Sequence, residues 1–161
     1  MTDLTLVEKG QMLVDGAARI RREFSMQVNR EISDPSELHE ALIRARTATD
    51  QLELALIHGM NLLRKAEIDL DIARASVEEA EINALDGVKG TQFSSAKEKS
   101  VEFNLRSLEE RRAERQALND YKQAKHVVDV LRLLHKGVDS ARYDLKARLD
   151  AVTLTRAIER G

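Results

Sequence analysis

The sequence predicts an all-α protein: a long antiparallel helical hairpin, or coiled coil, with an additional N-terminal helix, assembled into an oligomer. Charged residues make up 34% of the chain and aromatic residues only 3%, which is typical of long helices. The single proline is Pro35. A heptad pattern of apolar residues runs through the middle of the chain, and one strong turn signal follows it.

Residues 1–33 are predicted to form an N-terminal helix, from about Leu4 to Arg30, that serves as a packing or oligomerisation arm. Its apolar residues recur at helical spacing: they are Leu6, Leu13, Ala17, Ile20, Phe24 and Val28. Gly10 and Gly16 each cost about 1 kcal/mol relative to alanine, so this helix needs a packing partner. The sequence leaves open whether that partner is its own chain or a neighbour.

Residues 34–161 are predicted to form the hairpin, whose first helix runs over 35–85. Asp34 is suited to cap it, Pro35 to its first position and Glu37 to a capping box. From Leu38 to Ala84 an apolar seam alternates steps of four and three residues, a pattern that favours a supercoiled pair of helices.

One column of this seam consists mostly of small residues, which allow another backbone to approach closely. The residues expected to carry the hairpin and oligomer contacts are Leu42, Leu52, Leu56, Gly59, Leu63, Leu70, Val77, Val128 and Leu131. Isoleucines outside the seam widen the apolar surface beyond what one partner helix covers: Ile43, Ile57, Ile68, Ile72 and Ile82.

The turn of the hairpin is expected at 86–94, where two glycines lie close together. The last helix is predicted over 95–160, with Ser95 and Glu98 as a second capping box. The sequence allows one break in it, at Lys136-Gly137. The polar stretch Glu109–Gln116 is where this helix is expected to bend, fray or face something polar.

No catalytic, metal or cofactor site is expected. The four histidines lie far apart in sequence and in no metal-binding spacing, and the chain has no cysteine. Gly87–Thr91 lacks the length of a phosphate-binding loop and a preceding strand. The first 30 residues lack a signal peptide, and no apolar run reaches the about 18 residues that span a bilayer. We therefore expect a non-enzymatic cytoplasmic protein (in the host cytoplasm if it is phage-encoded) without a membrane partner.

Charge divides the chain into an acidic part and a basic part. Residues 1–86 hold 10 Lys and Arg against 17 Asp and Glu (10 − 17 = −7), and residues 87–161 hold 16 against 11 (16 − 11 = +5). Such parts can pair with each other, with a neighbouring copy or with a polyanion.

A basic row follows the last helix beside its apolar seam. Steps of four and three residues place Arg111, Arg115, Lys122, Lys125, Arg132 and Lys136 in it, together with Leu118 and Asp129. Two interpretations stay open. The row can follow a phosphate backbone with salt-sensitive, sequence-independent contacts, or it can pair with the acidic helix as an ordinary coiled-coil flank.

Several features of the second half have counterparts in one known family. They are an Ala-rich helix that ends in a small Gly-containing loop, then Phe93-Ser94 and Lys97–Ser100, then a long helix with Tyr121, Lys122 and Lys125, and finally Leu131–Asp139 before a terminal amphipathic helix. In these features residues 59–160 resemble the tailed-phage recombination mediators (the UvsY-like proteins). The acidic Glu78, Glu79, Glu81 and Asp86 depart from that family, which is typically basic near the turn.

The resemblance implies a ring-like homo-oligomer that binds single-stranded DNA and helps to load a RecA-type recombinase in exchange for the single-strand binding protein. The phosphate contacts would then come from Lys89, Lys97, Lys99, Arg111, Arg112, Arg115, Lys122 and Lys125. The alternative is a structural or scaffolding coiled coil, an assembly factor or adaptor that does not bind DNA. A third hypothesis, an inhibitor whose acidic patch over 67–86 imitates DNA, rests on that patch alone.

Overall fold

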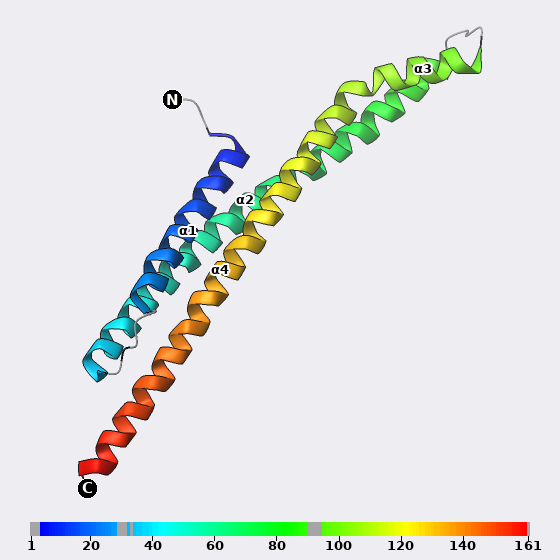
Figure 1. The fold of residues 1–161 in the computed structure, drawn as a ribbon. Coiled ribbons are helices and arrows are strands. Elements are labelled where there is room, and N and C mark those ends of the chain that lie inside the picture. Colours follow the sequence, from blue (N-terminus) through cyan, green and yellow to red (C-terminus); the bar gives the residue numbers. More distant parts are fainter. Residues whose placement is uncertain (1–3, 29–31, 33, 90–94, 161) are drawn as a thin grey trace. The chain divides into compact units, whose positions relative to one another are not determined.

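The computed structural model describes residues 4–28, 32, 34–89 and 95–160, and these residues form four helices and no strand (Figure 1). The helices are α1 (Leu6–Val28), α2 (Pro35–Lys89), α3 (Ala96–Arg106) and α4 (Leu108–Arg160). The predicted all-α class is confirmed. None of the described helices is long and apolar enough to cross a membrane.

The chain forms two compact units, and each of the long helices α2 and α4 contributes one part to each unit. Unit 1 comprises Met1–Asn61 and His126–Gly161, so it holds α1, the first part of α2 and the second part of α4. Unit 2 comprises Leu62–Lys125 and holds the rest of α2, α3 and the beginning of α4.

The core of unit 1 is shared by three helices. Ala17 and Phe24 of α1 belong to the same buried cluster as Leu38 and Leu52 of α2 and Leu131 of α4. The N-terminal helix therefore packs on its own chain. Its glycine at position 10 is buried, and a Cβ there would lie 2.8 Å from Cγ2 of Val127, so this glycine brings α1 close to α4.

The helices begin at side chains suited to capping them. Thr5 and Glu8 form a reciprocal capping box before α1: the Thr5 amide donates to Oε2 of Glu8 (2.8 Å), and the Glu8 amide donates to Oγ1 of Thr5 (3.3 Å). The predicted starts are confirmed: α2 begins at Pro35, after Asp34, and the Ser95 hydroxyl accepts from the Glu98 amide (3.2 Å) at the start of α3.

The predicted seam of α2 is kept away from solvent along its length. Leu52, Gly59 and Leu70 are buried, whereas Leu42, Leu56, Leu63 and Val77 are partly buried. Val128 and Leu131 of α4 are 1% and 0% exposed. By contrast, all five isoleucines outside the seam are at least 47% exposed.

The predicted end of the first hairpin helix at 85 is wrong. The described helix α2 continues through Asp86, Gly87 and Val88 to Lys89. Burial of Val88 to 2% exposure favours this continuation, and Lys89 pairs with Asp86 one turn earlier (3.0 Å). The remainder of the predicted turn, 90–94, lies outside the described residues.

The prediction of one helix over 95–160 is also wrong, because the structure has two, α3 and α4. The break lies at Ser107, where φ is −110° and ψ is 11°. The buried hydroxyl of Ser107 donates to the carbonyl of Phe103 (3.3 Å), a bond that competes with regular helical geometry. Helix α4 then continues through Gly137 to Arg160.

Candidate nucleic-acid interface

All eight predicted phosphate-binding cations lie in unit 2. Lys89 is at the end of α2, Lys97 and Lys99 are in the first turn of α3, and the other five are on α4. Among the residues that the structure describes, two of these cations form ion pairs within the unit and six do not.

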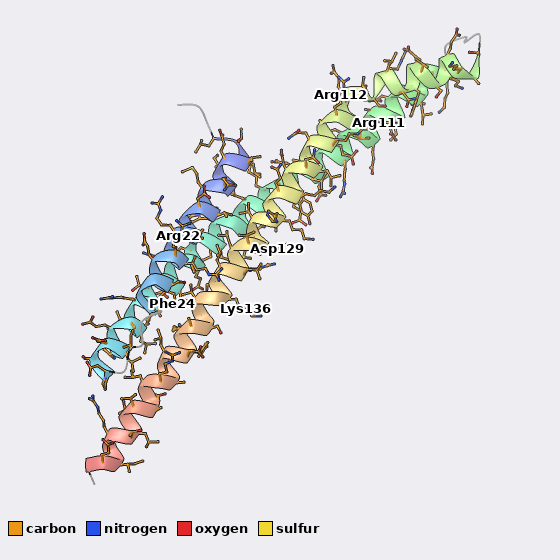
Figure 2. All side chains as sticks on the ribbon, viewed as in Figure 1. Arg22, Phe24, Arg111, Arg112, Asp129 and Lys136 are labelled. Carbon is orange, nitrogen blue, oxygen red and sulfur yellow. The ribbon has the colours of Figure 1, made fainter. Side chains whose placement is uncertain are left out.

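Arg111 connects α4 with α2 (Figure 2). Its Nη2 lies 2.7 Å from Oε1 of Glu81, and its Nη1 donates to Oδ1 of Asn104 (3.3 Å). The guanidinium carbon lies 5.7 Å from the centre of the Phe103 ring. These contacts hold a half-buried side chain in one geometry, so Arg111 acts as a structural cation.

Lys89 is paired less firmly. Its Nζ lies 3.0 Å from Oδ1 of Asp86, but both side chains are about 70% exposed (72% and 69%). Exposed pairs of this kind contribute little to stability, typically below about 1 kcal/mol. Lys89 can therefore exchange Asp86 for another anion.

The remaining six cations are exposed and have no ion-pair partner among the described residues: Lys97, Lys99, Arg112, Arg115, Lys122 and Lys125. Arg115, Lys122 and Lys125 follow one another at steps of seven and three residues, which places them on one face of α4. Arg112 lies beside the structural Arg111, as Figure 2 shows.

Pairing between the acidic and basic helices uses few of these charges. Among the described residues of unit 2, two ion pairs join different helices: Arg111 with Glu81 at 2.7 Å and Arg74 with Glu114 at 3.9 Å. Both lie where the polar stretch 109–116 faces α2, as predicted for that stretch. Pairing with the acidic helix, as in an ordinary coiled coil, thus accounts for Arg111 but not for the six exposed cations named above.

A second group of cations, in unit 1, was missed by the sequence analysis. Arg46 of α2 and Arg142 and Lys146 of α4 line an open groove of about 620 Å³ together with Tyr143. We call this the Tyr143 groove; its other lining residues are His39, Leu42, Ile43 and Asp50. The close spacing of Arg142, Tyr143 and Lys146 along one helix indicates a basic site beside an aromatic ring. The sequence does not show that Arg46 of another helix lines the same groove.

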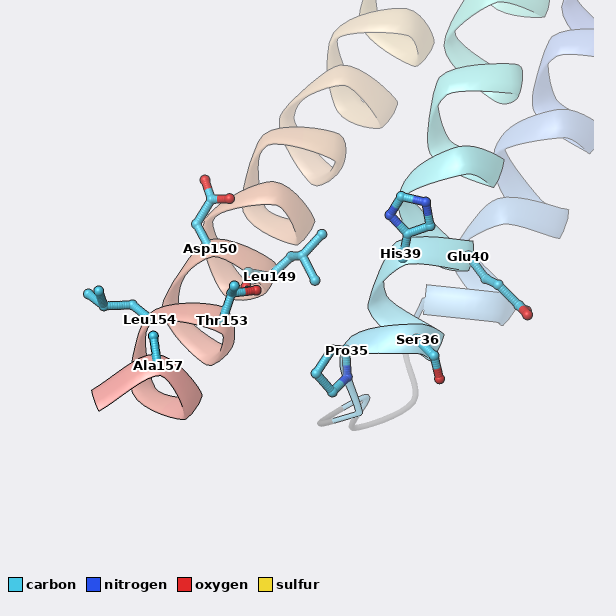
Figure 3. A pocket seen from close by; sticks show the side chains of 9 residues that line it. All are labelled: Pro35, Ser36, His39, Glu40, Leu149, Asp150, Thr153, Leu154 and Ala157. Atoms are coloured by element: carbon cyan, nitrogen blue, oxygen red, sulfur yellow. The ribbon is translucent and has the colours of Figure 1, made fainter. Parts of the chain in front are cut away.

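The neighbouring groove has a different chemistry, although it also includes His39. It measures about 920 Å³ and lies between the beginning of α2 and the end of α4 (Figure 3). Its charged residues are the carboxylates Glu40 and Asp150, and Leu149, Leu154 and Ala157 add apolar surface from α4. It therefore does not suit a phosphate.

Within the described residues, no three or more His, Asp or Glu side chains gather where they could hold a metal ion. Comparisons with protein-family models, with curated proteins and with solved structures found no match to this chain.

Proposed function

We propose that this chain is a non-enzymatic accessory protein of phage-type recombination that binds single-stranded DNA through phosphate contacts. The observation that supports it is the set of six exposed cations in unit 2 that have no ion-pair partner in the described part of the chain. Lysine and arginine bind DNA without sequence preference by neutralising phosphates and releasing counterions. An acidic α2 with few pairs to these cations leaves their charge available to a polyanion.

The recombination context rests on the resemblance of residues 59–160 to the phage mediators. In that context the protein works as a homo-oligomer and helps to load a RecA-type recombinase in place of a single-strand binding protein. Arg111 is removed from the proposed contact set, because Glu81 already occupies its guanidinium.

The test is a fluorescence-polarisation titration of labelled oligo(dT) across a salt series. Each phosphate contact to a single strand contributes about −0.7 to the slope of log K against log salt. Replacing Arg112, Arg115, Lys122 and Lys125 by serine should therefore make the slope shallower by about 3. A matched control replaces three exposed cations of α1 in unit 1, Lys9, Arg19 and Arg22.

The control should bind with a nearly unchanged slope. Absence of binding by the wild type at about 50 mM salt, or an unchanged slope in the fourfold variant, would refute the proposal. Circular dichroism should show equal helicity in all forms, because exposed substitutions of this kind change stability by about 0.5 kcal/mol or less.

A structural or scaffolding coiled coil is the second candidate, and the exposed apolar surface of unit 2 favours it. Ile68, Ile72, Ile82 and Leu85 of α2 are 49–60% exposed, and Val101 of α3 is 51% exposed. None of the described residues of α3 is buried. Large apolar side chains gathered on a surface mark interaction sites. This candidate predicts self-association that does not depend on DNA.

A further inference from the structure

The Tyr143 groove combines the two chemical features that a single nucleic-acid strand requires. A strand offers a charged phosphate and a flat base, and proteins bind it with cations along the backbone and aromatic side chains against the bases. Within unit 1, the groove holds three cations and one tyrosine ring. Its volume of about 620 Å³ falls within the usual range for ligand sites, about 300–1,000 Å³.

The cations come from two helices that face each other across the groove. Arg46 extends from α2, whereas Arg142 and Lys146 lie one turn apart on α4. Asp50 is the one carboxylate in the lining, and Asp139 pairs with Arg142 from outside it, so the groove and this pair carry a surplus of one positive charge (3 − 2 = +1). Arg46 and Lys146 are exposed and form no ion pair with any described residue.

Arg142 is held in place before any ligand arrives. Its Nη2 lies 2.8 Å from Oδ1 of Asp139, and the two side chains are only 31% and 29% exposed. Its guanidinium carbon lies 5.2 Å from the centre of the Tyr143 ring. Attraction between this cation and the ring helps to hold Tyr143 in the groove.

Tyr143 itself stays accessible. It is 60% exposed, so a base can reach its ring from solvent. The other tyrosine, Tyr121 in unit 2, is half-buried. Sequence-tolerant stacking of a base on such a ring adds to binding because every base has a π-face.

We propose that the Tyr143 groove is a second contact for single-stranded nucleic acid, in which Arg46 and Lys146 bind phosphate and Tyr143, held beside the ion-paired Arg142, stacks on a base. The inference rests on the proposed function and adds a site in unit 1 to the cations of unit 2. It also supplies the base contact that the cations of unit 2 lack.

Tyrosine fluorescence tests this inference directly, because the chain has two tyrosines and no tryptophan. In a Tyr121→Phe variant all tyrosine emission comes from Tyr143, and in a Tyr143→Phe variant all of it comes from Tyr121. Oligo(dT) should quench the emission of the first variant and leave that of the second unchanged. Polyphosphate, which has phosphates but no bases, should compete for binding without quenching Tyr143.

Binding is followed in the same samples by the polarisation of labelled oligo(dT). Tyr143→Ala should weaken binding by about 5- to 150-fold, the range for loss of one stacked base, whereas Tyr143→Phe should bind like wild type. Replacing Arg46 and Lys146 by serine should make the salt slope shallower by about 1.4. Arg44→Ser is the matched control, because Arg44 is an exposed cation of α2 outside the Tyr143 groove.

The outcomes separate the two proposals. Binding by polarisation without quenching of Tyr143, or with equal affinity in Tyr143→Ala, overturns the inference and leaves the proposed function standing. No binding by any form overturns both. Quenching together with weaker binding by Tyr143→Ala supports both.

Discussion

Gly59 shows how a single small residue sets the distance between two helices of unit 1. An added Cβ at this buried position would lie 2.7 Å from Cδ1 of Leu131 and 3.6 Å from Cγ2 of Val128. Leu131 is 0% exposed, so it has little room to move. The small-residue column of the seam therefore allows α2 and α4 to approach closely at this position.

Gly59→Leu is expected to lower the free energy of unfolding by about 1–3 kcal/mol, because extra atoms in a packed core force their neighbours to shift. Gly16→Ala is the matched control: a Cβ there meets nothing within 4 Å, so better helix propensity should raise stability by up to about 1 kcal/mol. Urea unfolding followed by circular dichroism measures both. Equal stability of Gly59→Leu and wild type would contradict the close packing at Gly59.

Among the charged residues, the sequence did not show which cations form ion pairs within the protein. It identified Arg111 as a phosphate-binding cation, but Glu81 and Phe103 hold it within the protein. The two ion-paired residues are 30 positions apart in sequence. Which acid meets which base depends on the register between two helices, and a heptad pattern does not determine that register.

At the scale of the element, the start of α1 depends on hydrogen bonds to a carboxylate, so its stability varies with pH. The amide of Thr5, and next its hydroxyl, donate to the carboxylate of Glu8 and lower the pKa of that carboxyl group. Because its folded-state pKa lies below its unfolded value of about 4.3, the carboxylate stabilises α1 above that pH. This contribution is lost as the pH falls through the lowered folded-state pKa.

Glu8→Gln is therefore expected to weaken α1 at neutral pH and to differ little from wild type at about pH 3. Hydrogen exchange of the α1 amides, measured across this pH range, follows the effect within the helix. Glu53→Gln, an exposed substitution on α2, is the control and should leave these exchange rates unchanged. A Glu8→Gln effect that persists undiminished at pH 3 would show that the capping carboxylate is not its cause.

Helix α3 is too short, and buries too little apolar surface, to be stable through its own residues alone. It has only 11 residues, none of which is buried among those described, and isolated helices shorter than about 12–15 residues are marginal in water. Its local support comes from the Ser95 cap and from the Glu102–Arg106 pair at 2.8 Å. Covering its exposed Val101 and Leu105 would add the apolar burial that it lacks.

At the scale of the whole molecule, the exposed apolar side chains of α2 predict self-association. We expect light scattering to show a mass that rises above 18.2 kDa with protein concentration, because covering these side chains removes apolar surface from water. Replacing Ile68, Ile72 and Ile82 by serine should shift this association to higher concentration by at least about tenfold, corresponding to about 1.4 kcal/mol. Ala75→Ser, on the same exposed part of α2, is the control.

These substitutions leave the seam untouched, so helicity should be preserved. A mass that stays at 18.2 kDa at every concentration would contradict self-association through this surface. A triple variant that associates like wild type would locate the contact elsewhere. Repeating the measurement with oligo(dT) distinguishes a scaffold, which assembles equally without it, from a DNA-dependent assembly.

The sequence by itself determined the all-α class, the starts of α2 and α3 and the seam of α2, because caps and heptad spacing act over a few neighbouring residues. Tertiary structure alone decided that α2 continues to Lys89, where burial of Val88 outweighs the signal of two nearby glycines. It also decided that Glu81 holds Arg111 and that Arg46 lines the same groove as Arg142, Tyr143 and Lys146. These contacts depend on how one helix is aligned against another, and that alignment is set by packing between residues far apart in the chain.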